Sequence, residues 1–512
     1  MKPVRVRKSG LLRASGLALA AMSMTVSTGI VAQPAAAQAA PSYRIDPAKL
    51  AGLEHFIDGV MAQQLDNREV AGATVAVVHQ GKLLFARGYG YQDVDKKIPV
   101  DPARTLFRPG STSKLFTWTA LMQLVEQGKV KLDDDVNKYI DFKIPATKSK
   151  PILIRHLLAH NPGLSDKGGL TVEDPSGFED LGPFLANNMP DRVREPGVEI
   201  SYSNHATALA GYIVERVSGE DFYDYVENHI FKPLGMNSTT FREPLPANLA
   251  PNMAVGYTME DGRFEAQPFE LYHNIAPAGS GSSTATDMAN FMLAHLNEGR
   301  LGSAQILKPE TARLMHSNLF TNVQGFPGYA HGFYVVRSEG PRLIGHGGNT
   351  RDFHSMLLLA PEADFGIFVS ETGGQGSYGG RTELINAVIG RLFPVAPSPR
   401  YTGPVTPPPV GAYAPNRRDY SRPISPRMYL RVIAEGDRGV VLDQGGDRTY
   451  WEQIGPKAYE KVTGTRAGGP YDKIIFYGDG NDMKMSFASL PMMLFRMDPN
   501  APPAETKDDS ED

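Results

Sequence analysis

A proline-rich segment divides this chain into two parts. Seven prolines lie within residues 394–410. Proline has no backbone N–H and is excluded from helix interiors and central strands, so the segment predicts a stiff, extended linker. The hydrophobic pattern also differs on its two sides. The sequence therefore predicts a large domain at residues 45–393 and a smaller one at residues 411–498.

The larger part begins and ends with strand patterns and has helix patterns between them. Two apolar runs flank Gln80-Gly81, which predicts a β-hairpin. This order predicts an α/β domain whose sheet is built from both ends of its sequence. Helices are expected at residues 47–65, 112–128, 152–160, 204–218, 221–232, 285–299, 309–316 and 382–392, and later strands near 331–337, 355–359 and 365–370.

The part after the linker contains short apolar runs separated by glycine and aspartate turns. Such spacing predicts a small β-barrel or sandwich. The last segment, residues 499–512, is rich in proline and then acidic, which is typical of a disordered tail. The expected strands include residues 429–433, 439–442, 473–477 and 483–487.

The N-terminus has the layout of an export signal. A basic start precedes a small, apolar stretch, and Ala-x-Ala sites allow cleavage after Ala37 or Ala39. We interpret residues 1–39 as a signal peptide, with an uncleaved anchor as the alternative. No later segment has the roughly 20 apolar residues that a membrane-spanning helix needs. The mature chain is therefore expected in the periplasm or outside the cell, without a transmembrane span.

Composition excludes several classes of protein. The net charge of −4 over 512 residues gives no basic surface for nucleic acid. The chain has no cysteine, which excludes disulfides, thiolate nucleophiles and cysteine-ligated metal sites. An exported chain without disulfides needs a large hydrophobic core for its stability. Nothing in the sequence indicates an organic cofactor or a metal.

One short motif predicts nucleophilic chemistry. Ser111 and Lys114 lie three residues apart at the start of a predicted helix, so the lysine amine can reach the serine hydroxyl. At a helix N-terminus, the backbone N–H of Ser111 is free to stabilise a developing oxyanion. Taken alone, the pair is equally consistent with a helix-capping serine and a surface lysine.

Two further motifs follow in a fixed order, Tyr202-Ser203-Asn204 and His346-Gly347-Gly348. Together with the Ser111 motif they resemble the S-x-x-K, Y-x-N and K-T-G or H-x-G hallmarks of the serine β-lactamase and penicillin-binding-protein superfamily. Within it, the chain is similar to class C β-lactamase-like esterases and D-aminopeptidases. Three supporting stretches share this resemblance, which covers about residues 50–392: residues 154–164, 233–236 and 283–288.

The resemblance implies a fold and a set of roles. The fold is the β-lactamase/transpeptidase-like α/β fold, an antiparallel sheet flanked by helices plus a helical region, here followed by a small, lipocalin-like β-barrel. Ser111 would be the acylated nucleophile, with Lys114 and Tyr202 as its general base. The substrate would be bound by Asn204, which can instead hold Lys114, and by His346, Gly347, Gly348 and Asn349, with the N–H groups of Ser111 and Asn349 as the oxyanion hole.

Some residues have competing interpretations. Tyr272-His273-Asn274 repeats the Y-x-N pattern but lies too far from Ser111 for the family spacing. His156 and His160 have the i, i+4 spacing of a zinc pair, yet no acid follows them, which favours a structural role. Arg351 and Asp352 either select charge at the pocket rim or form a local ion pair.

His346 occupies a position where relatives often have lysine. An imidazole is about half protonated near pH 6.5, so a substrate carboxylate would be held less firmly, and we expect weak or absent β-lactamase activity. We expect an exported serine hydrolase that cleaves amide bonds of small peptides, including linearised cyclic ones, in the manner of a D-aminopeptidase or carboxypeptidase. The alternatives are a carboxylesterase on short acyl esters, a weak β-lactamase, a non-catalytic binder of cell-wall peptide, and a scaffold acting through the β-barrel.

Overall fold

The computed structural model describes residues 43–337, 339–462 and 472–503. The predicted signal peptide and the acidic end of the predicted tail lie outside these residues. Among the helices described, none combines the length and the apolar character needed to cross a bilayer.

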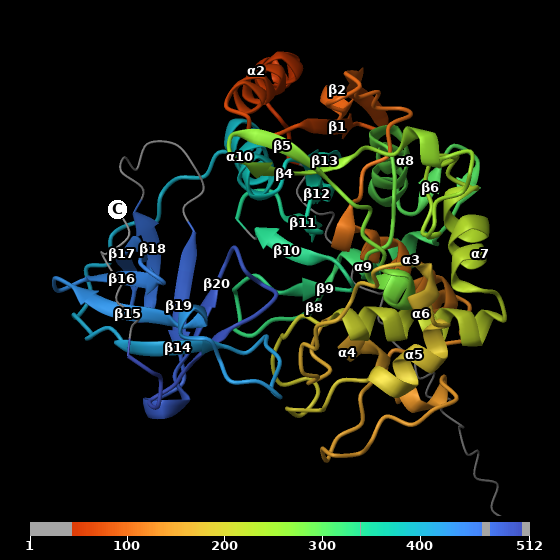
Figure 1. Cartoon of the computed structure of the whole chain (residues 1–512). Helices are drawn as coiled ribbons and strands as arrows, with labels where there is room; N and C mark the ends of the chain where they lie inside the picture. The colour runs from red at the N-terminus through yellow and green to blue at the C-terminus, as the bar shows by residue number, and fades with distance from the viewer. Residues whose placement is uncertain (1–42, 338, 463–471, 504–512) are drawn as a thin grey trace, which may run out of the picture. The chain divides into compact units, whose positions relative to one another are not determined.

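One large antiparallel sheet organises the part before the linker (Figure 1). In the described residues its nine strands run in the order β3-β2-β1-β13-β12-β11-β10-β9-β8, so strands from both ends of the domain pair at its centre, as predicted. The strands are β1 (Gly72–His79), β2 (Lys82–Asp93), β3 (Ile98–Pro99), β8 (Asn318–Phe320), β9 (Tyr329–Ala330), β10 (Tyr334–Arg337), β11 (Leu343–Asn349), β12 (Phe353–Ala360) and β13 (Phe365–Thr372).

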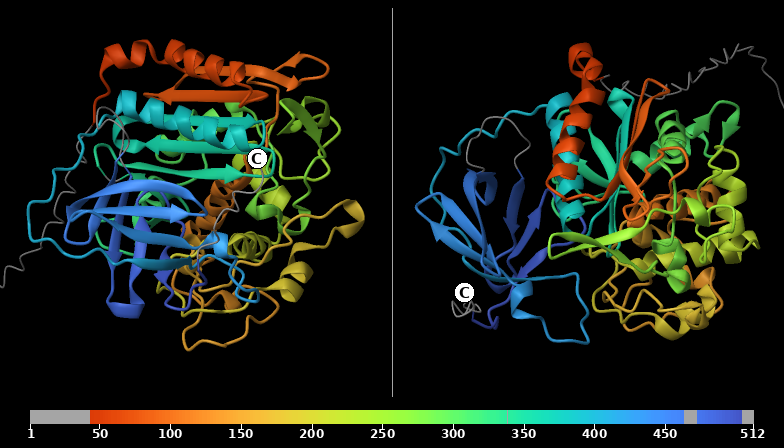
Figure 2. Two further views of the ribbon diagram at one scale, coloured as in Figure 1. Left: turned by 60° about the vertical axis from the view of Figure 1, so that its left-hand side comes forward. Right: turned by 45° about the horizontal axis from the view of Figure 1, so that its top comes forward.

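Helices cover both faces of this sheet (Figure 2). Val75 and Val77 of β1 pack against α2 and α10, whereas Ala76 and Val78 point to the other face, which α8 and the helical region cover. This alternation is the period of a strand buried on both sides. The helices are α1 (Pro47–Ala51), α2 (Leu53–Asp66), α3 (Lys114–Glu126), α4 (Ile154–Leu158), α5 (Leu181–Asn188), α6 (Asn204–Ser218), α7 (Phe222–Val226), α8 (Ala285–Leu296), α9 (Pro309–His316) and α10 (Gln375–Leu392).

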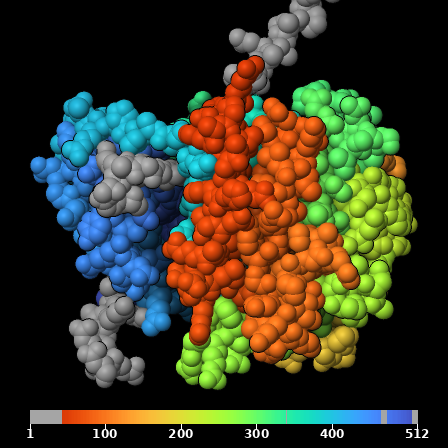
Figure 3. All heavy atoms as spheres, turned by 90° about the horizontal axis from the view of Figure 1, so that it is seen from above, coloured from red at the N-terminus to blue at the C-terminus, as the bar shows by residue number. Residues whose placement is uncertain are grey.

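The hairpin predicted around Gln80-Gly81 joins β1 and β2. Both turn residues have positive φ, 49° and 68°, as a tight two-residue hairpin turn requires. Helix α2 lies beside this hairpin, and the Tyr89 hydroxyl of β2 donates to Asp58 of α2 at 2.8 Å. Figure 3 shows the surface that they form, with the helix in red and the hairpin in orange. Two smaller hairpins lie elsewhere, β4 (Gly256–Glu260) with β5 (Arg263–Gln267), and β6 (Arg300–Leu301) with β7 (Ala304–Gln305).

The predicted helices are found, but some of their bounds differ. The helix expected at 47–65 is broken at Gly52 into α1 and α2. The helix expected at 221–232 is α-helical only to Val226 and continues as a wider, π-type turn. The helix expected at 382–392 begins at Gln375, and the glycines in its first turns, which have low helix propensity, weaken the helix pattern there.

The part after the linker forms a closed antiparallel barrel in which each strand pairs with the next and the last pairs with the first. Aromatic and aliphatic side chains fill its interior, with Trp451 and Phe476 among them. The α/β class with a C-terminal barrel is therefore confirmed. The barrel strands are β14 (Gly411–Pro415), β15 (Leu430–Glu435), β16 (Gly439–Gln444), β17 (Asp447–Gly455), β18 (Ala458–Val462), β19 (Lys473–Tyr477), β20 (Lys484–Phe487) and β21 (Phe495–Met497).

Candidate active site

Ser111 lies in the turn directly before a long buried helix. A 3₁₀ turn, Gly110–Ser113, leads directly into α3, which begins at Lys114. Gly110 has a φ of +53°, a conformation that glycine adopts without strain. This turn places Ser111 and Lys114 on one face, and the Lys114 Nζ lies 3.0 Å from the Ser111 Oγ.

Lys114 is enclosed by polar atoms but has no carboxylate partner. Its amine donates to the Asn204 Oδ1 at 2.8 Å and to the backbone oxygen of Ala278. No carboxylate of the described residues forms an ion pair with it. Burial holds the pKa of Lys114 well below its usual range, and the nearby Arg417 guanidinium lowers it further. A neutral amine 3.0 Å from a serine hydroxyl can accept its proton.

Tyr202 and Asn204 flank the start of α6. The Ser203 Oγ caps this helix by accepting from the Ala206 N–H at 3.2 Å, which places Asn204 in its first turn. The Lys114 Nζ lies 5.1 Å from the centre of the Tyr202 ring. Burial raises the pKa of the Tyr202 hydroxyl. Within the described chain that hydroxyl has no hydrogen-bond partner, although Ser111 lies near enough to oppose the rise.

Strand β11 lies directly against the loop that carries Ser111. A Cβ atom at Gly348 would lie 1.8 Å from the Pro109 oxygen and 2.9 Å from the Ser111 nitrogen. A Cβ at Gly110 would lie 2.9 Å from the Asn349 nitrogen. The two predicted oxyanion-hole donors, Ser111 and Asn349, therefore come from neighbouring backbone segments. Arg381 of α10 donates to the Asn349 Oδ1 at 2.9 Å and holds this end of the strand.

His346 is present at the site but does not have the charge state that its sequence suggested. It is buried, and its Nδ1 lies 2.7 Å from the Gly347 oxygen, while its Nε2 has no partner in the described structure. Burial lowers the pKa of His346 to about 3, and the neighbouring Lys114 lowers it as well. The ring is therefore neutral at pH 7, even more fully than a hydrated imidazole with its usual pKa near 6.5, because it is enclosed.

The barrel contributes two groups that sequence reasoning missed. The Cζ atom of Arg417, which follows β14, lies 4.7 Å from the centre of the Tyr202 ring. The backbone oxygen of Met492 accepts the Tyr202 N–H at 3.0 Å. Neither residue belongs to a recognisable motif, and both lie far from Ser111 along the chain.

His160 was expected to be structural, and its contacts place it beside Tyr202. Its ring stacks on the Tyr202 ring with centres 4.2 Å apart, and its Nδ1 accepts the Ser203 N–H at 3.2 Å. His156, its partner in the zinc alternative, accepts the Leu153 N–H at 3.0 Å at the start of α4. His160 therefore holds the backbone beside Tyr202, and His156 holds the backbone at the start of α4.

The second Y-x-N pattern lies away from Lys114. Asn274 is buried and its Oδ1 accepts the Glu179 N–H at 2.9 Å, while the Tyr272 hydroxyl donates to Glu270 at 3.0 Å. Both groups are engaged in the loop that they stabilise.

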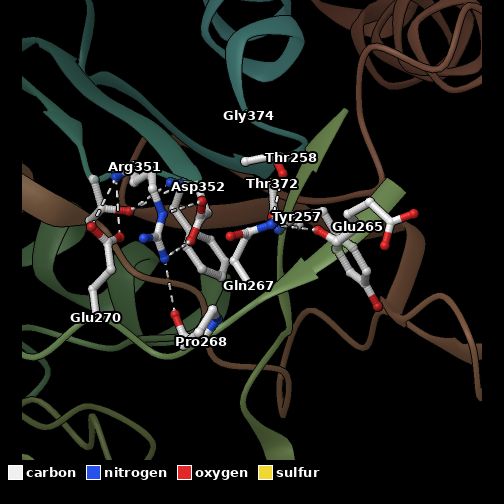
Figure 4. A network of polar contacts seen from close by, with 12 residues as sticks. Tyr257, Thr258, Glu265, Gln267, Pro268, Glu270, Arg351, Asp352, Thr372 and Gly374 are labelled. Atoms are coloured by element: carbon white, nitrogen blue, oxygen red, sulfur yellow. Dashed lines mark hydrogen bonds and ion pairs between the residues drawn. The ribbon is translucent and has the colours of Figure 1, made fainter. Parts of the chain in front are cut away.

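Arg351 and Asp352 form a local ion pair, 3.0 Å between Nε and Oδ1, within a larger network (Figure 4). The Arg351 N–H donates to the Glu270 carboxylate and its side chain to the Pro268 oxygen, so the turn after β11 is tied to the segment that follows β5. Asp352 and Glu270 also line a cavity of about 410 Å³. Between the two sequence interpretations, these contacts favour the ion pair.

Comparisons with known proteins agree with this architecture. The Beta-lactamase family profile matches residues 57–388. Protein flp of Staphylococcus aureus is 29% identical over 321 residues, which are 61% of this chain and 62% of flp. The chain thus spans less than two thirds of the length of that relative.

Two solved structures share the fold. The octameric penicillin-binding protein homologue from Pyrococcus abyssi is 24% identical, with a TM-score of 0.56, over 87% of this chain and 100% of its own. The D-amino acid amidase from Ochrobactrum anthropi SV3, complexed with L-phenylalanine amide, is 24% identical, with a TM-score of 0.55, over 66% of this chain and 98% of its own. The family profile covers more than half of the chain and includes the Ser111, Tyr202 and His346 motifs, so this chain belongs to the Beta-lactamase family.

Proposed function

We propose that this chain is an exported enzyme that cleaves amide bonds of small peptides or amino acid amides through an acyl-enzyme on Ser111. One observation carries the proposal: the Lys114 amine lies 3.0 Å from the Ser111 hydroxyl, is fully buried and has a lowered pKa. A capping serine with a surface lysine would not bury the amine. Burial without a carboxylate partner favours the uncharged form that a general base needs.

The chemistry then follows from the positions of these atoms. The Ser111 Oγ attacks the substrate carbonyl carbon as its proton passes to Lys114, directly or through the Tyr202 hydroxyl. The oxygen that becomes negative would be stabilised by the N–H groups of Ser111 and Asn349. Collapse of this intermediate breaks the carbon–nitrogen bond, and the transferred proton leaves with the amine. A water molecule then attacks the acyl-enzyme ester, and the same base accepts its proton. The bond between the acyl carbon and the Ser111 Oγ breaks, the acid leaves, and the proton returns to the Oγ.

Asn204 and the Ala278 oxygen would hold the Lys114 amine during these steps. Their contacts leave the amine directed at the Ser111 hydroxyl. A base fixed in this way loses little entropy on reaching the transition state. Removal of the nucleophile itself should cost about 10⁴–10⁶ in rate, by analogy with other serine hydrolases.

The preference for small substrates rests on the barrel. Met492 and Arg417 both contact Tyr202, so barrel residues border the proposed site on one side. Such a border favours short peptides or chain ends over polymers. The choice of an amide over an ester draws on the fold shared with the amidase of Ochrobactrum anthropi SV3.

The test of this function is the mass of the intact protein after exposure to a fluorophosphonate. We expect one adduct on the wild type and none on Ser111→Ala. Well-folded wild type that forms no adduct would contradict the proposal. Turnover of D-aminoacyl amides, L-aminoacyl amides and short acyl esters of matched size would then rank the substrate classes, and a preference for esters would favour the carboxylesterase alternative.

Export can be tested separately. The N-terminal sequence of the protein recovered from the periplasm or medium should begin after Ala37 or Ala39. Retention of an intact N-terminus in the membrane fraction would instead support an uncleaved anchor.

A further inference from the structure

A permanent positive charge beside Tyr202 comes from the barrel. On the β11 side, the buried His346 is neutral at pH 7, because its pKa is lowered to about 3. From the barrel, the guanidinium Cζ atom of Arg417 lies 4.7 Å from the centre of the Tyr202 ring. Lys114 lies 5.1 Å from the same centre. Arg417 therefore supplies a permanent cation to a site whose own strand provides none.

Arg417 is engaged on one edge only. Its Nε donates to the Asp166 Oδ2 at 2.9 Å, and the side chains are 25% and 21% exposed. Neither terminal nitrogen of its guanidinium hydrogen-bonds to another of the residues described. The pair is thus partly screened by solvent, but its positive end faces Tyr202 and its negative end is held by the loop after α4.

Hydrogen bonds fix the chain on both sides of Arg417. Asn416 is 1% exposed and donates to the Glu199 Oε1 at 3.0 Å and to the Ile200 oxygen at 2.8 Å. Its Oδ1 accepts the Leu494 N–H of the barrel at 3.0 Å. After Arg417, the Arg418 oxygen accepts the Asp166 N–H at 2.9 Å. These contacts dock the segment against the larger domain.

We propose that Arg417 is a positioning residue of the Ser111 site, whose cation, brought from the barrel to the face of Tyr202, favours the neutral amine of Lys114 and the negative charge that develops on Ser111 or Tyr202. Asp166 opposes this action and sets its strength. The barrel is then part of the catalytic centre. This inference rests on the proposed function and deepens it.

The electrostatic signs support the assignment. A cation near Lys114 disfavours its protonated form, and a carboxylate favours that form. Accordingly, Arg417 lowers the pKa of Lys114 while Asp166 raises it, and Arg417 also opposes the rise in the pKa of Tyr202. Four other titratable side chains lie around Lys114 and Tyr202: His160, His346, Tyr329 and Tyr334. The pKa of each is shifted so that its uncharged form is favoured at pH 7.

The experiment is the pH dependence of the rate at which a fluorophosphonate labels Ser111 in the full chain. Labelling should fall at acid pH as Lys114 becomes protonated. In Arg417→Gln this acidic limb should move to higher pH, because the repelling cation is lost and Asp166 is left unpaired. In Asp166→Asn it should move to lower pH. At a fixed pH on the acidic limb, the labelling rate of each variant should differ from that of the wild type by about tenfold, as expected for the loss of one nearby charge.

The chain offers matched controls. Arg418→Gln removes an adjacent cation whose guanidinium lies over the Tyr420 ring, 4.1 Å from its centre, and should leave the profile unchanged. Arg417→Lys retains the charge and should keep the wild-type limb. The double variant R417Q/D166N should return the limb toward the wild type. If Arg417→Gln fails to fold, the Asp166→Asn and Arg417→Lys profiles still decide the question.

The outcomes separate this inference from the proposed function. Absence of labelling of the wild type at every pH would overturn both. Normal labelling with superimposable profiles for wild type, Arg417→Gln and Asp166→Asn would overturn only the role of Arg417. So would equal shifts in Arg417→Gln and Arg418→Gln, since these would indicate loosened docking rather than a charge effect.

Discussion

Replacement of Gly348 by alanine tests the contact between β11 and the Ser111 loop. The added Cβ would lie 1.8 Å from the Pro109 oxygen, whereas ordinary contact begins at 3.4 Å, so the two backbones have to separate by about 1.6 Å. Both contacting groups are backbone and neither can rotate away. A displacement of about 1 Å costs on the order of 10²-fold in rate, or about 2.7 kcal/mol of activation free energy.

We therefore expect Gly348→Ala to label with fluorophosphonate at least about 10²-fold more slowly than the wild type. The matched control is Gly390→Ala in α10, where an added Cβ meets nothing within 4 Å. It should label at the wild-type rate. Thermal unfolding of both variants separates a local displacement from global loss of structure. A folded Gly348→Ala protein with the wild-type labelling rate would refute the assigned contact between strand and nucleophile.

Three further predictions concern buried ionisable groups. Lys114→Met should slow Ser111 labelling by about 10²–10⁴-fold without abolishing folding, since it removes the base and leaves the packing volume; wild-type labelling would exclude Lys114 as the base. Nitrocefin hydrolysis at pH 7 should be weak or absent, because neutral His346 offers no charge to a carboxylate; turnover near that of dedicated β-lactamases would contradict this. Glu371 is fully buried, and burial raises its pKa against the opposing effect of Arg381. The protonated carboxyl of Glu371 therefore contributes stability at low pH, and this contribution is lost as the pH rises through the raised pKa. Between pH 6 and pH 9, Glu371→Gln should lose less free energy of unfolding than the wild type, as measured by urea unfolding at each pH.

The contact between Ser111 and Lys114 could be predicted because it is local. Ser111 and Lys114 lie one helical turn apart, so a helix start alone brings their side chains together. Asn204 could be placed beside them only through the resemblance to a family, because its contact with Lys114 spans a large sequence separation. The sheet was predictable in outline, since its strands are apolar runs with clear turns.

The rest depends on tertiary packing. The neutral state of His346 follows from enclosure by neighbouring rings, which its sequence surroundings do not indicate. The position of Arg417 beside Tyr202 could not be predicted, because a single arginine in a loop forms no sequence pattern. That position depends on how the barrel docks. The early start of α10 and the barrel strands β14, β17, β18 and β21 were missed because glycine, charged residues and short lengths weaken the local signal.

The hydrogen bond from Tyr202 to Met492 has a consequence for the newborn protein. Ser111, Lys114 and Tyr202 are synthesised long before Met492. Tyr202 therefore leaves the ribosome before the residue that accepts its backbone hydrogen bond exists. The Tyr202 N–H therefore gains this acceptor only after the segment before β21 has been synthesised, and a chain that is halted or clipped before that point lacks the hydrogen bond.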